Sequence, residues 1–362
     1  MAYSPNTPPI PEPIRIAVIG CGWIGAFHAR SLAGHLPGVR LEAVADPAPG
    51  AAAALATELG IAKHTTDPAD LFADPDVDGV LIAAPSAFHA TLIAQAAAAG
   101  KHVFSEKPAG LDLAELEGAL DAVDRAGVEF QIGFNRRFAA DFAEAKNRIN
   151  AGDIGSVQLM RSLTRDPGTS DGIAHAARIK PNTIFLETLI HDFDTLNWFN
   201  EGARVTEVRA MADALVEPSF KDGGLLDTAV VTLRYDNGAI AVAEASFSAL
   251  YGYDVRGEVF GSAGMATAGH PVQLATGTFT AAGAQAPTER LNIELFAGAY
   301  RAELAHFAQL IAARNGNAEA PAVPTPGAQA ARDALEIALA CVESVRTGEA
   351  VRLVRETAGG AR

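Results

Sequence analysis

A chain of 362 residues is long enough for two domains with separate cores, and its formal net charge of −15 argues against a nucleic-acid or anionic-membrane partner, since both need a basic face. With only two cysteines, Cys21 and Cys341, a disulfide framework is not expected, and no apolar run approaches the roughly 20 residues of a membrane-spanning helix. The Pro-rich N-terminus lacks the charged start and apolar middle of a signal peptide, so we expect a cytoplasmic protein.

The first third of the chain opens on a G-x-G-x-x-G motif between a strand pattern and a helix pattern. The apolar run 16–19 predicts the strand, and Gly20, Gly22 and Gly25 follow it. Gly20 permits a tight turn, Gly22 lets the backbone approach a pyrophosphate, and Gly25 lets the helix pack on the strand. The N–H groups and dipole of the helix N-terminus then face the phosphates.

A second apolar run, 41–45, ends in Asp46 about 20 residues past the glycines, where a carboxylate can bind the ribose 2′-OH of NAD. The same carboxylate would repel the 2′-phosphate of NADP, so the sequence predicts NAD as the cofactor. Cys21 lies inside the glycine turn, where a small residue is needed, and is interpreted as a filler rather than a redox group.

Strand and helix patterns go on alternating as far as residue 133. This alternation predicts a parallel sheet that is covered on both faces. The expected helices are residues 50–59, 87–99 and 112–126, and the expected strands are residues 79–83, 102–105 and 128–133.

From about residue 157 the pattern changes to longer β-rich segments with turn signals between them. The turn Asp236-Asn237-Gly238 between alternating residues is typical of a hairpin. We therefore predict an α/β protein with a dinucleotide-binding Rossmann domain, a doubly wound parallel sheet, over residues 1–134, and an α+β domain with a mostly antiparallel sheet over residues 135–362. The expected strands are 157–164, 205–212, 228–235, 239–248 and 254–260, and the expected helices are 184–199, 300–314 and 328–346.

Glu106 and Lys107 follow the strand 102–105 at its carboxyl end, which is where open α/β sheets place ligands. A lysine there can donate to a substrate hydroxyl and make a nearby alkoxide easier to form. The alternative interpretation is a plain turn at Lys-Pro.

Glu187 and His191 are four residues apart in a helix pattern, so both side chains lie on one face. A carboxylate behind a histidine orients the ring and stabilises imidazolium, which makes a general base suited to an alcohol proton. An ordinary helix-face contact has the same spacing. Arg136 and Arg137, which follow strand 128–133, are by default a solvated or salt-bridging pair.

The order of these motifs resembles the glucose–fructose oxidoreductase, inositol dehydrogenase and MocA family over nearly the whole chain. After the glycine motif and Asp46 come APSAFH (84–89), SEKP (105–108), GFNRRF (133–138) and the helix with Glu187 and His191. The segments most similar to the inositol 2-dehydrogenase branch are GFNRRF, IHDFD (190–194) and YGYDVRGEVFGSAGM (251–265).

The resemblance implies a C-terminal domain with a large open-faced antiparallel sheet, through which subunits associate, often as tetramers. It also implies that Lys107 and His191 are the catalytic pair, with an acidic residue four before the histidine as their partner. The family usually has Asp there, whereas this chain has Glu187. The extra methylene moves the carboxylate by about 1–1.5 Å and can change the fit to the substrate ring.

We therefore predict an oxidoreductase that transfers a hydride from a secondary alcohol of a cyclic, inositol-like polyol or sugar to NAD, with no metal. The predicted catalytic residues are Lys107, Glu187 and His191. The predicted cofactor contacts are Gly20, Gly22, Trp23, Ile24, Gly25, Asp46, Ala84, Pro85, Ser86, His89, Glu106 and Lys107. The predicted substrate contacts, by resemblance, are Arg165, Asp166, Glu187, His191, Tyr251 and Tyr253, although the tyrosines equally suit strand positions at a subunit interface.

Two alternatives stay open. The same family includes anhydrosugar dehydrogenases and NAD-dependent glycosidases, which oxidise and re-reduce their substrate in one cycle. A non-catalytic NAD-sensing regulatory protein could also keep this fold, although Lys107 and His191 argue against it because a sensor needs no proton acceptor beside the nicotinamide. The sequence does not specify the polyol, the hydroxyl that is oxidised or the physiological direction.

Overall fold

The computed structural model describes residues 12–34, 36–168, 180–270, 277–281 and 283–353. Most of the Pro-rich N-terminal segment therefore lies outside the described residues. Contacts within the chain divide it into two units. The first comprises residues 1–140 and 296–335, and the second comprises residues 141–295 and 336–362. The sequence predicts a single boundary after residue 134, whereas residues 296–335 lie in the first unit.

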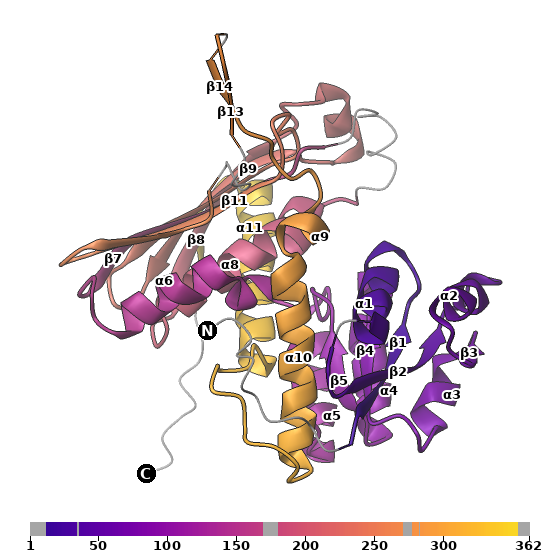
Figure 1. Ribbon diagram of the computed structural model, residues 1–362. Coiled ribbons are helices and arrows are strands. Elements are labelled where there is room, and N and C mark those ends of the chain that lie inside the picture. Colours follow the sequence, from indigo (N-terminus) through magenta and orange to yellow (C-terminus); the bar gives the residue numbers. More distant parts are fainter. Residues whose placement is uncertain (1–11, 35, 169–179, 271–276, 282, 354–362) are drawn as a thin grey trace, which may run out of the picture. The chain divides into compact units, whose positions relative to one another are not determined.

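A six-stranded parallel sheet in the order β3-β2-β1-β4-β5-β6 forms the centre of the first unit (Figure 1). The order reverses between β1 and β4, and in open α/β sheets ligands bind at such a switch point, outside the carboxyl ends of the strands. The predicted strands are confirmed, while the short β3 was not predicted. The strands are β1 (Ile14–Ile19), β2 (Val39–Ala45), β3 (Lys63–Thr65), β4 (Gly79–Ile82), β5 (His102–Ser105) and β6 (Phe130–Ile132).

The helix α10 (Ala297–Arg314) explains why a late segment joins the first unit. Its residues Leu304, Phe307 and Ile311 are fully buried in one apolar cluster with side chains of β1, β2 and α1. Burial of these side chains is the main force that holds α10 there. The other helices of this unit are α1 (Trp23–Gly34), α2 (Ala51–Leu59), α3 (Pro68–Ala73), α4 (His89–Ala98) and α5 (Leu113–Ala126), and α11 (Ala328–Thr347) begins in it.

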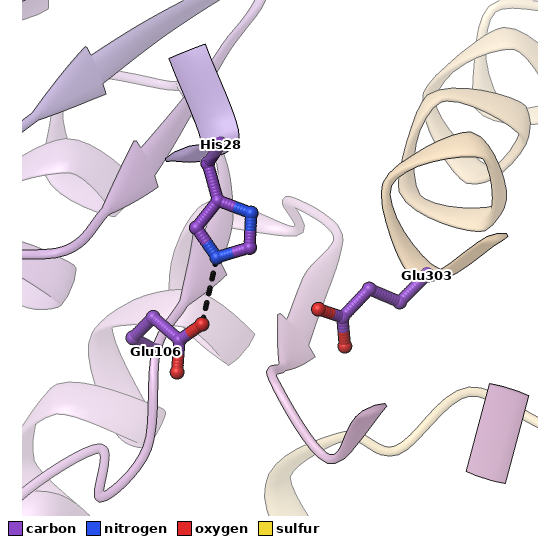
Figure 2. A group of neighbouring side chains, drawn as sticks. All are labelled: His28, Glu106 and Glu303. Carbon is purple, nitrogen blue, oxygen red and sulfur yellow. Dashed lines mark hydrogen bonds and ion pairs between the residues drawn. The ribbon is translucent and has the colours of Figure 1, made fainter. Parts of the chain in front are cut away.

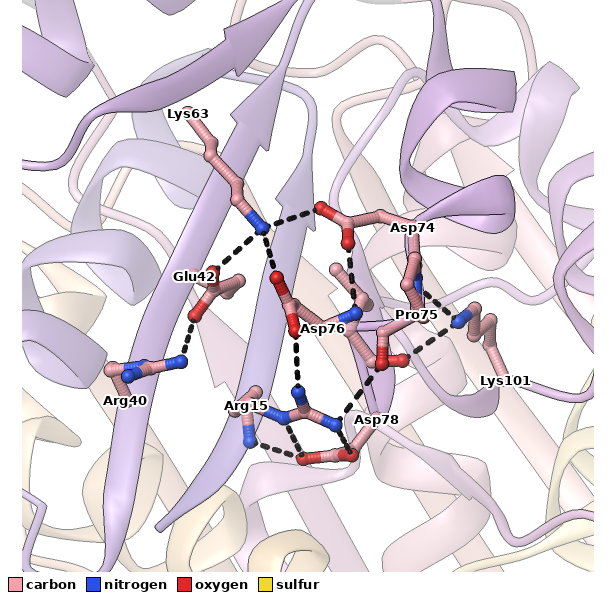
Figure 3. Close-up of polar contacts among 10 residues, drawn as sticks. Arg15, Arg40, Glu42, Lys63, Asp74, Pro75, Asp76, Asp78 and Lys101 are labelled. Atoms are coloured by element: carbon pink, nitrogen blue, oxygen red, sulfur yellow. Dashed lines mark hydrogen bonds and ion pairs between the residues drawn. The ribbon is translucent and has the colours of Figure 1, made fainter.

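Ion pairs cross-link the amino edge of this sheet (Figure 3). Arg15 Nη2 lies 2.7 Å from Asp78 Oδ1, and the Arg15 amide donates to Asp78 Oδ2 at 2.7 Å. Burial raises the pKa of the Asp78 carboxyl, but the hydrogen bonds from Arg15 more than offset this and leave it lowered. Lys63 Nζ lies 2.8 Å from Asp74 and 2.9 Å from Asp76. These contacts tie the segments at the amino ends of the strands to one another.

A seven-stranded sheet in the order β12-β11-β7-β10-β9-β8-β15 forms the centre of the second unit. Only β7 and β10 pair in parallel, which confirms a mostly antiparallel sheet. The predicted hairpin joins β9 to β10, and Gly238 adopts the positive φ of +90° that its turn requires. The strands are β7 (Val157–Arg165), β8 (Val205–Asp213), β9 (Thr228–Tyr235), β10 (Ile240–Ser246), β11 (Asp254–Gly261), β12 (Met265–Ala268) and β15 (Val351–Arg352).

Helices cover one face of this sheet. Phe142 of α6 (Ala140–Asn150) stacks on Phe199 of α8 (Ile190–Phe199) with ring centroids 6.2 Å apart. Both rings lie over Gly257 of β11, where an added Cβ would come within 3.1 Å of Phe199. The helix α6 was not predicted from the sequence. Among the described helices, none is both long and apolar enough to cross a membrane.

The opposite face of the sheet is open. Residues of β9 alternate strictly between buried and exposed, as expected for a sheet covered on one side. Large apolar side chains remain exposed along the strands: Leu159, Met211, Val230, Ile240, Phe260 and Met265. We call these six residues the open apolar face. Beyond this sheet, β13 (Thr278–Thr280) and β14 (Gly283–Gln285) form a separate two-stranded ribbon.

Candidate active site

The glycine turn between β1 and α1 has the shape that a pyrophosphate requires. Gly20 has a φ of +98°, and a Cβ at Gly25 would lie 1.9 Å from the Gly20 carbonyl oxygen. A Cβ at Gly22 would meet no protein atom within 4 Å, so Gly22 borders open space. Because α1 begins directly after this space at Trp23, its free N–H groups can receive a phosphate there. These residues fit a dinucleotide.

Asp46 is fixed beside the same turn. Its Oδ2 accepts a hydrogen bond from the Cys21 amide at 2.6 Å, and its Oδ1 accepts one from the Ala48 amide at 2.8 Å. The contact to Cys21 ties the end of β2 to the glycine turn, where the ribose of a bound dinucleotide is expected. Burial, together with the charge of Asp46, raises the pKa of the Cys21 thiol to about 12. A neutral thiol is a poor nucleophile, which favours the interpretation of Cys21 as a filler.

His89 links the ends of two neighbouring strands. Its Nε2 lies 2.6 Å from the carbonyl oxygen of Ala84, after β4, and its Nδ1 lies 2.7 Å from that of Pro108, after β5. The side chain is buried. Both ring nitrogens therefore face the main chain, so His89 holds the two loops in place rather than offering a free polar group.

Glu106 is also buried, and its Oε1 lies 2.7 Å from Nε2 of His28 in α1. Glu106 is one of the predicted cofactor contacts, whereas neither His28 nor the neighbouring Glu303 of α10 is predicted from the sequence. The only signal in the sequence was the presence of polar residues at positions where the helix pattern is otherwise apolar.

In the second unit, the helix that carries Glu187 and His191 is irregular. A π-helical stretch, Ile184–Leu189, precedes α8, whereas the sequence predicted one regular helix over 184–199. Glu187 lies in the π stretch and His191 in the first turn of α8, and both are partly exposed. Single π turns inside helices occur frequently at functional sites.

A buried carboxylate fixes the turn on which His191 sits. Asp192 accepts hydrogen bonds from Ser162 Oγ at 2.5 Å and from Thr164 Oγ1 at 2.6 Å, both on β7. Charge-assisted hydrogen bonds of this kind are about twice as strong as neutral ones. The hydroxyl of Thr195 also donates to the His191 carbonyl oxygen at 2.7 Å. The backbone of His191 is therefore held between the sheet and its own helix.

Two of the predicted substrate contacts, Arg165 and Tyr251, lie near the adjacent ends of β7 and β11. Arg165 ends β7 directly opposite Asp254, which begins β11. Tyr251 donates to Asp254 Oδ2 at 2.6 Å, and a hydrogen bond with Tyr251 raises the pKa of the Arg165 guanidinium. Asp166 caps the following turn by accepting from the Gly168 amide at 2.8 Å. Hydrogen-bonded polar side chains therefore gather at the adjacent ends of these two strands.

Each unit is similar to a domain of known proteins. The model of an oxidoreductase family with an NAD-binding Rossmann fold matches residues 14–134, and that of a GFO/IDH/MocA C-terminal domain matches residues 142–267. The scyllo-inositol 2-dehydrogenase (NAD(+)) of Bacillus subtilis is 36% identical over 342 residues, which are 94% of this chain and 96% of the relative. The chain belongs to the GFO/IDH/MocA oxidoreductase family.

Other members of the GFO/IDH/MocA family are similar in sequence and structure. A myo-inositol 2-dehydrogenase of Thermotoga maritima is 39% identical over 251 residues, which are 69% of this chain and 74% of the relative. The crystal structure of scyllo-inositol dehydrogenase from Lactobacillus casei with bound NAD(H) and scyllo-inositol has a TM-score of 0.87 at 29% identity, covering 94% of this chain and 99% of that one. The resemblance drawn from the motifs is thereby confirmed.

Proposed function

We propose that this protein is an NAD-dependent dehydrogenase that oxidises a secondary alcohol of an inositol or a closely related cyclic polyol. The observation that carries this proposal is similarity over 94% of the chain to an enzyme named scyllo-inositol 2-dehydrogenase (NAD(+)). The glycine turn and Asp46 of this chain supply the matching cofactor site.

NAD, bound through the glycine turn and Asp46, supplies the hydride acceptor. His191 accepts the proton of the substrate hydroxyl, and Glu187 orients its ring. Lys107, at the carboxyl end of β5, donates to the same oxygen and stabilises the alkoxide as it forms. The strand-end segment 84–89 and the backbone of Glu106 and Lys107 line the nicotinamide side, and the buried His89 side chain fixes the loops that do so.

Among the substrate contacts, Arg165, Asp166, Tyr251 and Tyr253 bind the ring hydroxyls. The polar set at the edge of β7 and β11 supports the assignment of Arg165 and Tyr251. Of these four, Tyr251 is 48% exposed and so accessible to a ligand.

A panel of inositol isomers and aldoses, assayed by NADH absorbance with NAD and with NADP, tests the proposal. We expect NADH to form with at least one inositol, and NAD to be preferred because Asp46 would face the 2′-phosphate of NADP. Consumption of a glycoside without net NADH would instead identify an NAD-dependent glycosidase. NAD binding without turnover of any compound would identify a sensor.

Glu187 is the residue through which we expect substrate preference to be set. Glu187→Asp should restore the usual carboxylate position and shift kcat/KM unequally among the polyols. Glu187→Gln should lower it for every polyol, because an amide cannot stabilise imidazolium as a carboxylate does. If Glu187→Asp scales all substrates by one factor, Glu187 does not contact the substrate.

We further propose that subunits associate through the open apolar face, as a homotetramer. Six large apolar side chains are exposed on this one face of the sheet, and large exposed apolar patches mark interaction sites. A cytoplasmic location agrees with the two cysteines, which are both unpaired, since disulfides are rare in reducing compartments.

A further inference from the structure

Three ionisable side chains meet in the interior of the first unit (Figure 2). His28 comes from α1, Glu106 from the end of β5 and Glu303 from α10, and their ligand-type atoms lie within 4.8 Å of one another. Their exposed fractions are 0%, 6% and 0%. In Figure 2 the Glu303 carboxylate points toward the other two side chains. None of these groups takes part in the chemistry proposed above for Lys107 and His191.

Aromatic rings flank this cluster. The His28 ring makes edge contacts with Phe104 and Tyr300, at centroid distances of 5.9 Å and 5.6 Å. Within the described part of the chain, neither carboxylate oxygen of Glu303 has a hydrogen-bond partner. A buried carboxylate without donors is strongly unfavourable in its ionised form, so the charge state of Glu303 requires an explanation.

A shared metal ion does not fit the distances. Two atoms bound to one ion at about 2.1 Å with tetrahedral or octahedral angles lie about 3 Å or more apart. Nε2 of His28 and Oε1 of Glu106 are 2.7 Å apart, which is the distance of a charge-assisted hydrogen bond. A proton therefore lies between these two groups.

A hydrogen bond connects Glu106 to Lys107, the next residue in the chain. Its Oε2 accepts a hydrogen bond from the Lys107 amide at 3.2 Å, and its own amide donates to the Ile82 carbonyl oxygen at 2.8 Å. Gly133 leaves room for the carboxylate, since a Cβ there would lie 3.3 Å from Oε2. Rotation of the Glu106 side chain would therefore break its hydrogen bond to the Lys107 amide.

We propose that Glu303 is a neutral carboxylic acid in the folded protein, and that Glu303 and His28 are positioning residues that hold the Glu106 carboxylate and, through it, Lys107. The step to Lys107 rests on the function proposed above. The cluster then contains one carboxylate charge, on Glu106, which the His28 Nε2–H stabilises.

The electrostatic surroundings agree with this assignment. Burial, reinforced by the charge of Glu106, raises the pKa of Glu303 well above its usual range. Burial also raises the pKa of Glu106, but the hydrogen bond from His28 more than offsets this and leaves it lowered. The two carboxyl groups are thus driven to opposite protonation states.

Infrared difference spectroscopy of the 13C-glutamate-labelled protein tests the protonation state without cofactor or substrate. At pH 8, subtraction of Glu303→Gln from the parent should reveal the carbonyl stretch of a protonated carboxylic acid. The matched control is Glu58→Gln, an exposed residue paired with Arg30 at 2.6 Å, which should remove only a carboxylate band. A carboxylate band for Glu303 would overturn the proposal.

Steady-state kinetics test the positioning role. Among variants at 303, Glu303→Gln should lose least kcat, because its amide is uncharged and has almost the size and shape of the neutral acid, whereas Glu303→Leu should lose about 10- to 100-fold, as expected for a displaced catalytic group. The KM for NAD should change little. Equal losses in both variants, or stoichiometric metal that Glu303→Gln removes, would overturn the proposal.

The pH profile supplies a further readout. His28→Leu deprives Glu106 of its donor, so the pKa of Glu106 should rise and the acidic limb of kcat should move to higher pH. An unmoved acidic limb would contradict a link from His28 to Lys107. If Lys107→Met retains full kcat, the role proposed for Lys107 fails, whereas the infrared result on Glu303 still stands or falls by itself.

Discussion

The two sheets of this protein differ in what they expose: the first exposes its strand ends and the second exposes one whole face. In the first unit, β4 is buried on both faces, and the groups that can meet a ligand are found beyond the strand ends, at the glycine turn and Asp46. In the second unit, helices cover one face and the other is exposed. A doubly covered parallel sheet offers a ligand only its edge, whereas a half-covered antiparallel sheet offers a whole face.

The largest expected effect concerns the acid–base groups, one from each unit. Lys107→Met or His191→Ala should lower kcat by about 10²–10⁴, the usual contribution of a positioned proton donor or acceptor. Steady-state assays with NAD and the preferred polyol measure it. The dissociation constant of NAD and the melting temperature should change little.

Lys221→Met is the matched control for Lys107, since Lys221 is exposed and pairs with Asp213 at 2.9 Å. Its kcat should equal that of the parent. A Lys107 or His191 variant with normal kcat would remove that residue from the proposed mechanism.

Gly22 and Gly25 test the role of the glycine turn, because an added Cβ would meet different surroundings at the two positions. Gly25→Ala places a Cβ 1.9 Å from the Gly20 carbonyl oxygen, so it should destabilise the fold by about 1–3 kcal/mol, as overpacking does, and weaken NAD binding. Gly22→Ala meets no protein atom within 4 Å and should weaken NAD binding alone. Calorimetric titration and thermal unfolding separate the two outcomes. Equal melting temperatures for both variants would contradict the geometry of the turn.

Charged substitutions test whether the open apolar face is a subunit interface. Met211→Glu combined with Val230→Glu places two carboxylates on neighbouring strands of that face, and should lower the mass measured by light scattering to that of a smaller assembly. Phe279→Glu is the control, because Phe279 is 82% exposed on the separate β13–β14 ribbon. An unchanged mass for the double variant would mean that the face is not a subunit interface.

The features that were predicted correctly from the sequence are those that local residue patterns determine. The glycine turn, Asp46 and the strand before Lys107 are all defined by neighbours within a few residues, and the turn Asp236-Asn237-Gly238 predicted the hairpin that joins β9 to β10. Features that depend on distant partners were missed. Glu303 meets Glu106 only because α10 returns to the first unit. The π stretch Ile184–Leu189 was missed as well, because one extra residue in a turn leaves the apolar spacing almost unchanged.

The smallest expected effect tests how α10 is bound to the first unit. His306 of α10 is 7% exposed, its Nε2 lies 2.9 Å from Thr325 Oγ1, and its ring lies 5.2 Å from that of Phe138. Burial lowers the pKa of His306 to about 4, whereas an unfolded histidine titrates near 6.5. Between these values the unfolded chain binds more protons than the folded one, so stability must fall as the pH falls.

We therefore expect the free energy of unfolding of the parent to decrease by about 2 kcal/mol more than that of His306→Gln between pH 7 and pH 5. Glutamine keeps a polar group near Thr325 but does not titrate in this range, so subtraction removes the contribution of every other group. Urea unfolding at a series of pH values measures both curves. Parallel curves would mean that His306 becomes protonated without loss of structure, and that α10 is held less tightly against the first unit than its buried residues indicate.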